Sequence, residues 1–338
     1  MSDDGIKEAQ FWHSKEGNVQ CNLCHQQCLI KSGRRGLCGV REVQNGKLMT
    51  LVYGKLVASN VDPIEKKPLY HFLPGSLAYS IATVGCNFRC LHCQNADISQ
   101  ASKEMGNMVG EFVPPERVIA AARGTNCQTI AYTYTEPTIF FEYAYDVAVL
   151  AHESGLKNVF VSNGYIGDEA AEKIMPFMDG INIDLKGDDQ FYRKICGARL
   201  EPVKKNIKLM WDSGVWVEVT TLIIPGYNDS EEQLKGLTEF LSSVSIDMPW
   251  HVSAFHPMYR MRDILSTSRE ALRKGVKIGR EAGLRYIYVG NMPGENEDTI
   301  CPVCGELLIE RLGYKVMKNT IDESRCPKCG IFVPGVWS

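Results

Sequence analysis

Short apolar runs alternate with amphipathic stretches through the middle of this chain. The runs occupy residues 77–84, 129–135, 159–163, 181–185, 215–224 and 251–255, with a candidate seventh at 284–289. Apolar residues recur at helical spacing in 114–123, 138–154, 201–212, 230–242 and 267–281. Strands that alternate with helices predict a parallel sheet with helices on its outside. Because six strands cannot close an eight-stranded cylinder, we predict an α/β fold with a partial, TIM-like (β/α)6 barrel.

Cysteine-rich segments lie on either side of the predicted barrel. Residues 1–60 hold four cysteines among polar and turn residues, and residues 292–338 hold two Cys-Pro-x-Cys-Gly pairs. The pattern therefore predicts three parts. They are a Cys-rich N-terminal module (1–60), the partial barrel (61–291) and a zinc-ribbon-like C-terminal module (292–338).

Composition and charge narrow the class of protein. The 338 residues are 44% hydrophobic, enough for one large core and small appended modules. A formal net charge of -3 gives no overall basic field, so nucleic acid is not an expected partner. The N-terminus is polar and acidic, and no apolar run is long enough to cross a bilayer, so we expect a cytoplasmic protein without a membrane partner. In that reducing compartment the 13 cysteines favour metal ligation over disulfides.

One loop after the first predicted strand carries three cysteines: Cys86, Cys90 and Cys93. Ligands of such barrels bind where the strands end. Iron–sulfur clusters usually take four thiolates, so three would leave one iron open to the amino and carboxylate groups of an amino acid. The alternative is a zinc site completed by His25, His71 or His92.

The spacing Cys-x3-Cys-x2-Cys after a strand resembles the radical S-adenosylmethionine (SAM) superfamily. From about residue 77 to residue 257 the chain is similar to the glycyl-radical-activating branch. It resembles most the radical SAM enzymes of the AmmeMemoRadiSam system, which are similar to pyruvate formate-lyase activases. The resemblance implies a 4Fe-4S cluster on the three cysteines, SAM as cosubstrate, and an electron donor such as flavodoxin or ferredoxin.

The resemblance also implies contacts to the cosubstrate at the strand ends. In the activases a Gly-Gly-Glu segment receives the amino group of SAM, and the segment 134–137, Tyr-Thr-Glu-Pro, stands in its place. Segment 162–164 resembles the Asn-Gly turn near the methionine carboxylate and ribose. Segment 184–186 matches the Asp-Leu-Lys motif that contacts the cosubstrate. The implied contact residues, including a histidine near the adenosyl group, are Glu136, Ser162, Asn163, Gly164, Asp184, Lys186 and His256.

Charge alone makes some of these contacts reasonable. Lys186 could meet the carboxylate of a zwitterionic cosubstrate, and Glu136 could meet its ammonium group. Alternatively, Glu136, Asp184 and Lys186 form structural ion pairs at the strand ends. His256 is either a ligand contact or a histidine satisfied within the core.

The flanking cysteines predict further metal sites. Two paired knuckles give the four thiolates that zinc prefers, with rubredoxin-like iron as the alternative; they are Cys301, Cys304, Cys326 and Cys329. A less regular set could hold zinc or a second iron–sulfur cluster, or stay as reduced buried thiols; it comprises Cys21, Cys24, Cys28 and Cys38. Cys127 and Cys196 stand apart as small core residues, and Cys196 is the better candidate for another role.

We therefore expect an enzyme that cleaves SAM reductively and abstracts hydrogen from a substrate. Two kinds of substrate stay open: a partner protein that receives a glycyl radical, and a small molecule or nucleoside. Two other classes compete with an enzyme, namely a non-catalytic metal or electron-transfer protein and a zinc-ribbon module that binds nucleic acid.

Overall fold

The computed structural model describes residues 5–106 and 108–338, which divide into two compact units. Unit 1 takes in the described residues up to Asp62, Leu77–Gly180 and Ile195–Ala198. Unit 2 takes in Pro63–Ser76, Ile181–Lys194 and Arg199–Ser338. The three modules expected from the sequence stay a prediction.

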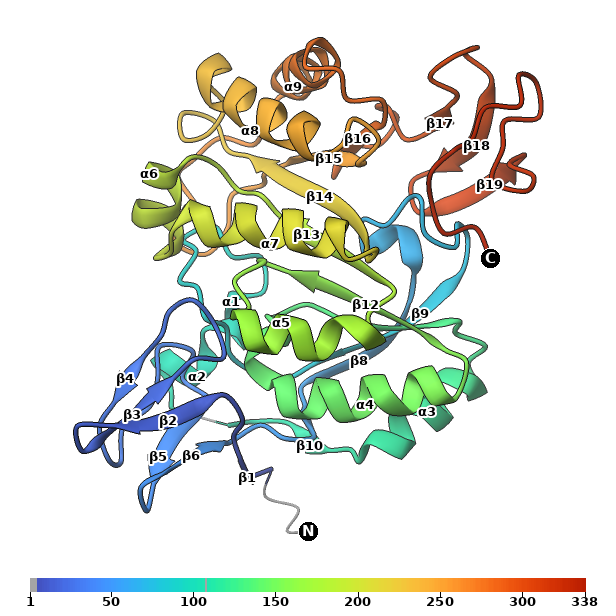
Figure 1. Cartoon of the computed structure of the whole chain (residues 1–338). Coiled ribbons are helices and arrows are strands. Elements are labelled where there is room, and N and C mark those ends of the chain that lie inside the picture. The colour runs from blue at the N-terminus through green and yellow to red at the C-terminus, as the bar shows by residue number, and fades with distance from the viewer. Residues whose placement is uncertain (1–4, 107) are drawn as a thin grey trace. The chain divides into compact units, whose positions relative to one another are not determined.

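A β-sheet forms the centre of unit 1 (Figure 1). Neighbouring strands follow the order β8 (Ala58–Pro63), β9 (Leu77–Ala82), β11 (Thr129–Tyr132) and β12 (Lys157–Ser162). Strand β11 is parallel to β9 and to β12, with Ala131 opposite Ser80 and Val159. All four residues of β11 are buried, as expected of a parallel strand covered on both faces. The carboxyl ends of β9, β11 and β12 therefore share one edge of the sheet.

The helices of unit 1 connect these strands. They are α1 (Ala96–Ser99), α2 (Ala101–Glu104), α3 (Pro115–Gly124), α4 (Phe141–Glu153) and α5 (Asp168–Ile174), with 3-10 turns η2 (Pro137–Phe140) and η3 (Met175–Phe177). Helix α4 packs on β11 and β12 and against α3. Its buried face includes Val147, Ala148 and Ala151, which are spaced to meet one side of the sheet.

The N-terminal part of unit 1 is built from short antiparallel strands. One sheet has the order β1 (Lys7–Glu8), β6 (Lys47–Thr50) and β5 (Arg41–Gln44). Another has the order β2 (Trp12–Lys15), β3 (Asn18–Cys21) and β4 (Leu29–Ile30), and β7 (Lys55–Leu56) pairs with β10 (Glu111–Phe112). These strands are too short to form a large core. Three of the four cysteines in this part are buried.

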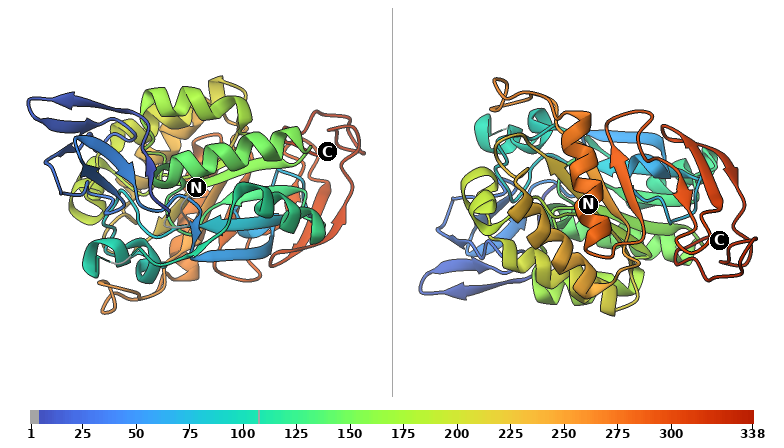
Figure 2. Two further views of the ribbon diagram at one scale, coloured as in Figure 1. Left: turned by 90° about the horizontal axis from the view of Figure 1, so that it is seen from below. Right: turned by 90° about the horizontal axis from the view of Figure 1, so that it is seen from above.

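Unit 2 repeats the strand–helix alternation. Its strands follow the order β13 (Gly180–Asp184), β14 (Trp216–Ile223), β15 (Trp250–Ala254) and β16 (Ile287–Gly290). Its helices are α6 (Asp189–Phe191), α7 (Leu200–Asp212), α8 (Glu231–Val244) and α9 (Arg269–Glu281), with the short segment η1 (Ile64–Lys66). The short helix η4 (Tyr192–Cys196) begins in unit 2, and its last two residues belong to unit 1. Helices α8 and α9 lie side by side, and α9 packs on β15 and β16 (Figure 2).

The C-terminal end of unit 2 is a three-stranded antiparallel sheet. It has the order β17 (Thr299–Ile300), β18 (Leu307–Leu312) and β19 (Lys315–Asn319). Its buried cysteines and apolar residues form one cluster with three tyrosines of unit 2: Tyr70, Tyr286 and Tyr288. The small sheet therefore shares a core with the larger one.

The α/β alternation expected from the sequence is confirmed, and the predicted strands match β9, β11, β12, β13, β14, β15 and β16. The features that were missed or misread include β8, the helix α5, and the start of 138–154, which is a 3-10 turn before α4. Within the described residues no helix combines the length and apolar character that a membrane span requires.

Candidate functional site

Gly85 begins the loop that carries the first three cysteines. Its φ of 104° lies in the left-handed region, and an added Cβ would stand 2.6 Å from Val40 Cγ1 and 3.1 Å from the Cys38 carbonyl oxygen. Glycine is therefore needed here for both conformation and space. The consequence is that Gly85, the residue before Cys86, packs closely against the N-terminal segment 38–40.

Hydrogen bonds hold the cysteine loop in place. The backbone N–H groups of Arg89 and Leu91 donate to the carbonyls of Cys196 and Ile195, at 2.8 and 3.0 Å. Cys196, which the sequence singled out as the better lone cysteine, is buried and contributes its backbone to this contact. Cys90 is buried and Cys86 and Cys93 are partly buried, so the three thiols lie at the boundary between core and solvent.

The surroundings of the loop supply charge and hydrogen-bonding groups. Burial raises the pKa of the Cys86 thiol, and the nearby Lys103 ammonium opposes that rise. Cys93 Sγ lies 3.1 Å from Ser99 Oγ. Lys103 and Ser99 come from the short helices after the loop, and a bound anionic group would be stabilised by them.

Glu136 follows β11 and is almost completely buried, at 1% exposure. Its Oε1 accepts hydrogen bonds from Thr138 N, Thr138 Oγ1 and Ser162 Oγ at 3.0, 2.7 and 2.8 Å. Its Oε2 accepts one from Asn163 N at 2.8 Å. Burial raises the pKa of Glu136, and these neutral donors lower it by less. The carboxylate is thus fixed between the ends of β11 and β12.

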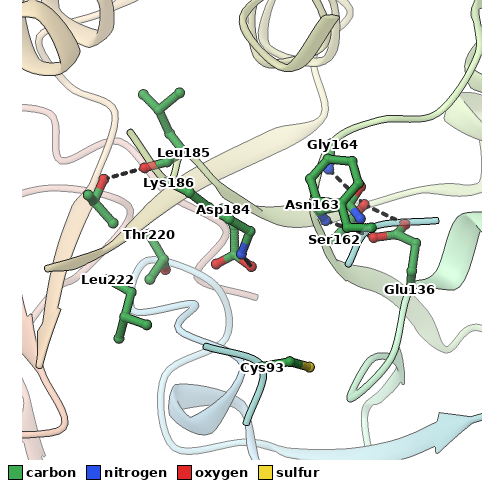
Figure 3. A network of polar contacts seen from close by, with 12 residues as sticks. Cys93, Glu136, Ser162, Asn163, Gly164, Asp184, Leu185, Lys186, Thr220 and Leu222 are labelled. Carbon is green, nitrogen blue, oxygen red and sulfur yellow. Dashed lines mark hydrogen bonds and ion pairs between the residues drawn. The ribbon is translucent and has the colours of Figure 1, made fainter. Parts of the chain in front are cut away.

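Asn163 joins this carboxylate to the cysteine loop. Its backbone meets Glu136, while its Nδ2 lies 2.7 Å from Asn87 Oδ1 and 3.9 Å from Cys86 Sγ. Gly164, at φ 69°, completes the turn, with its N–H donating to Ser162 Oγ at 3.0 Å (Figure 3). Unit 1 therefore brings Cys86, Glu136 and the segment 162–164 together.

The backbone after β11 is strained. Tyr134 has φ 62°, a conformation that bulky residues seldom adopt. Asn95 Nδ2 donates to the Tyr134 carbonyl at 2.7 Å, and the Tyr134 hydroxyl donates to Asp62. Such strain persists where neighbouring contacts hold it, often at functional sites.

The predicted contact residues of unit 2 have different environments. Lys186 Nζ and Asp184 Oδ2 form an ion pair at 2.7 Å, and the Lys186 carbonyl accepts a hydrogen bond from Asn228 Nδ2 at 2.7 Å. The backbone N–H of the intervening Leu185 donates to the Thr220 carbonyl at 2.9 Å. His256 is exposed after β15, so the alternative of a histidine satisfied within the core is wrong.

The C-terminal thiols converge closely, with all four sulfur atoms within 4.8 Å of one another. The pair Cys301 and Cys329 is 3.7 Å apart, and the pair Cys304 and Cys326 is 3.6 Å apart. A zinc ion with Zn–S bonds of about 2.3 Å separates its thiolates by about 3.8 Å. The geometry therefore fits one tetrahedral metal ion.

The other cysteines are arranged differently. Cys21, Cys24 and Cys38 are buried and Cys28 is partly buried, and the four line one cavity in unit 1. Cys127 is buried apart from these groups, as expected of a small core residue. The sequence did not single out Asn87, Ser99 or Lys103. Asn87 lies within the cysteine motif, which was a usable signal, whereas Lys103 shows no distinguishing pattern.

Comparison with known proteins agrees with this geometry. Residues 80–241 match the model of the Radical SAM superfamily. The chain is also 44% identical over 330 residues to an uncharacterised protein of Methanocaldococcus jannaschii, covering 96% of this chain and 98% of that protein. The chain belongs to the radical SAM superfamily. Radical SAM proteins are enzymes that use a 4Fe-4S cluster to cleave SAM reductively and start radical chemistry.

Two more distant proteins resemble parts of the chain. The pyruvate formate-lyase-activating enzyme of Staphylococcus aureus is 25% identical over 246 residues, which are 66% of this chain and 93% of that enzyme. A crystal structure of Streptococcus suis SuiB bound to S-adenosylmethionine superposes with a TM-score of 0.51 at 14% identity. That match covers 68% of this chain and 53% of SuiB, and it supports the α/β partial barrel.

Proposed function

We propose that Cys86, Cys90 and Cys93 hold the radical SAM cluster of this protein. The observation that carries this proposal is that three thiols leave one loop at the edge where β9, β11 and β12 end. Among the described residues, these thiols do not approach within the 4.8 Å that unites the C-terminal group. A wider arrangement suits a cluster in which each thiolate binds its own iron.

The zinc alternative at this loop has little support. His71 belongs to unit 2, where its Nδ1 lies 2.7 Å from the Pro334 carbonyl and its Nε2 lies 2.6 Å from the Tyr288 hydroxyl. His25 Nε2 lies 3.6 Å from Asp168 Oδ1. No histidine joins the three thiols in a group compact enough for one ion, within the described chain.

The residues around the loop prepare it for the cosubstrate. When bound, the cluster supplies the electron that splits the sulfonium into methionine and a 5'-deoxyadenosyl radical. Glu136 holds a buried negative charge that the ammonium group of SAM would offset, because the four donors described above are neutral. Asn163 and Gly164 shape the turn beside Cys86. Burial of these groups keeps water from the reactive radical.

Three further contacts to SAM rest on the family resemblance: Asp184, Lys186 and His256. The ion pair between Asp184 and Lys186 fixes the direction of both side chains before any ligand binds. A flavodoxin or a ferredoxin would supply the electron, because both are one-electron donors of low potential.

For the substrate, we propose a backbone glycine of a partner protein. The support is the likeness to the activating enzyme of Staphylococcus aureus, which extends over most of that enzyme. A small molecule or nucleoside is the second candidate.

Product analysis tests the proposed chemistry. The anoxic protein, reduced with dithionite, is incubated with SAM, and 5'-deoxyadenosine is measured by mass spectrometry. Wild type and the matched control Cys127→Ala should form it, whereas a variant with alanine at Cys86, Cys90 and Cys93 should not. Equal product from that variant would contradict the cluster assignment.

Substrate choice needs a separate experiment. Pyruvate formate-lyase with deuterated glycine serves as the protein probe. Deuterium in the 5'-deoxyadenosine and a glycyl radical signal in electron paramagnetic resonance (EPR) would support activation of a protein. If neither is seen while unlabelled product still forms, this glycyl radical enzyme is excluded as a substrate, and the small-molecule candidate gains weight.

A further inference from the structure

The four N-terminal cysteines surround a cavity in unit 1 that the proposed chemistry does not use. Cys21 is the last residue of β3, and Cys24 forms an isolated backbone β-bridge with Ile166. Cys28 and Cys38 lie in the loops before β4 and β5. All four line the same cavity, together with Arg41, Asn87 and Ile139 among others. Four thiols from separate loops around one cavity are a donor set for metal.

The spacing of these thiols differs from that of the C-terminal group. No three of them lie within 4.8 Å of one another, although the search over the described residues finds all four C-terminal thiols at that spacing. Four thiolates that bind one zinc ion have sulfur atoms about 3.8 Å from one another. A cluster spreads its thiolates more widely, because each binds a different iron. The cavity therefore fits a cluster better than a single ion.

A buried cation faces this cavity. Arg41 is 1% exposed, and its Nη2 donates to Glu142 Oε1 and to the Gln10 carbonyl, both at 2.7 Å. Its Nε and Nη1 have no hydrogen-bond partner within the described chain. Unsatisfied buried guanidinium N–H groups are costly, so they indicate an anionic group that the cavity would hold. Four thiolates bound to iron and sulfide carry such a charge.

A backbone N–H group also points toward one of these sulfurs. Leu37 N donates to Cys28 Sγ at 3.5 Å. Hydrogen bonds of this kind stabilise a thiolate and tune the potential of an iron–sulfur cluster.

The cavity adjoins the loop that carries Cys86. Asn87 lines it, and Gln26 Nε2 donates to the Asn87 carbonyl at 3.0 Å. The Cys38 carbonyl accepts a hydrogen bond from Ser102 Oγ at 3.2 Å and lies 3.1 Å from a Cβ built on Gly85. All of these residues belong to unit 1. A group bound here would therefore be a near neighbour of the radical SAM cluster.

We propose that Cys21, Cys24, Cys28 and Cys38 bind a second iron–sulfur cluster, which passes electrons to the first. A reduced flavodoxin or ferredoxin gives one electron to the second cluster and is oxidised by one electron. The same electron then moves to the cluster on Cys86, Cys90 and Cys93, which restores the second cluster to its oxidised form. The relay rests on the proposed function, whereas the binding site does not.

Metal analysis of the full chain tests the site. A variant with alanine at Cys86, Cys90 and Cys93 is purified without oxygen, and a second variant adds Cys21→Ala and Cys24→Ala. The first should retain iron and acid-labile sulfide with the Mössbauer spectrum of a cluster, and the second should lose both. Zinc should stay at about one per chain in each. About two zinc ions per chain without iron, or no metal beyond the C-terminal zinc, would overturn the proposal.

A milder variant guards against misfolding. Cys28→Ser, which alters the most exposed of the four thiols, should change the EPR spectrum of the second cluster while circular dichroism stays that of wild type. Cys127→Ala is the matched control and should change neither. An unchanged spectrum in Cys28→Ser would remove Cys28 from the proposed ligand set.

Spin coupling tests the relay separately. Fully reduced wild type should show an EPR spectrum broadened by interaction between two clusters, and this broadening should vanish when either cysteine group is replaced. Two independent signals would overturn the relay. Failure of the proposed function would instead appear as a lack of 5'-deoxyadenosine, whatever the iron content.

Discussion

The cysteine loop after β9 and the C-terminal cysteine sheet differ in how they are prepared for metal. The C-terminal group offers four thiols at the spacing of one ion, inside a shared apolar cluster. The loop offers three thiols beside a buried carboxylate and a strained turn. A closed ligand set serves structure, whereas an open position serves catalysis. Loss of a ligand should therefore mainly reduce activity in the loop and mainly reduce stability in the C-terminal sheet.

The largest effect is expected from Cys90→Ala. Loss of one of three ligands should abolish detectable SAM cleavage, because the cluster has no spare protein ligand there. The thermal midpoint should change much less than in Cys301→Ser. Product formation and thermal unfolding are measured on both variants. SAM cleavage that persists in Cys90→Ala would contradict the expected difference between the loop and the C-terminal sheet.

Cys301→Ser should act mainly on stability. Structural metal binding contributes directly to folding, so losing a thiolate should lower the free energy of unfolding by about 4 kcal/mol or more. SAM cleavage measured well below the new midpoint should persist. Zinc content and chemical denaturation provide the measurement, and equal loss of cleavage in both variants would show that the two regions are not separate.

The pH dependence of stability should come from unit 2. Burial lowers the pKa of His71 to about 4 from its usual 6.5. The unfolded chain therefore binds the proton first, and stability falls as pH drops from 6.5 to 4, by about 3 kcal/mol. Chemical denaturation between pH 6.5 and 4 should show that the free energy of unfolding decreases as pH falls. In His71→Gln, whose side chain stays neutral, this decrease should be smaller. An unchanged slope in the variant would exclude His71 as the source.

Glu218 should make stability depend on pH over a second, lower pH range. Burial raises the pKa of Glu218, but the hydrogen bonds from His251 and Trp216 and the charges of His251 and His71 together lower it more, so the net shift is downward. Its stabilising effect is complete above the usual 4.5 and is lost as pH falls through the lower folded value. Its carboxylate accepts hydrogen bonds from the backbone N–H groups of Tyr70 and His71, and these bonds place it near the C-terminal cluster.

The smallest effect is expected from Glu136→Gln. Loss of one buried negative charge should weaken SAM binding about tenfold, equivalent to about 1.4 kcal/mol. Equilibrium dialysis with the reduced protein measures this. Glu218→Gln is the matched control, since it removes a buried carboxylate of unit 2 and should lower stability without changing SAM affinity. Equal affinities in wild type and Glu136→Gln would remove Glu136 from the SAM contacts.

Much of the fold could be predicted because buried parallel strands are continuous apolar runs. Strand β16, Ile-Tyr-Val-Gly with its first three residues buried, is such a case. Strand β8 was missed because its sequence, Ala-Ser-Asn-Val-Asp-Pro, has little apolar character. Helix α5 was missed because seven residues are too few to establish a helical period.

The candidate site was predictable where one short segment carries the chemistry. The spacing of Cys86, Cys90 and Cys93 is visible in the sequence, as is the paired C-terminal motif. Contacts across long separations were not visible. Arg41 and Glu142 form a buried ion pair although 101 positions separate them. The exposure of His256 also depends on how the segment after β15 folds, which local pattern does not reveal.

EPR of the reduced, anoxically reconstituted protein, recorded before and after addition of SAM, tests most directly whether the loop holds an open cluster. We predict that SAM changes the cluster signal in wild type and in Cys301→Ser, and that SAM changes no signal when Cys86, Cys90 and Cys93 are alanine, because only the second cluster is then present. A cluster spectrum that stays the same at saturating SAM would contradict an open iron at these cysteines.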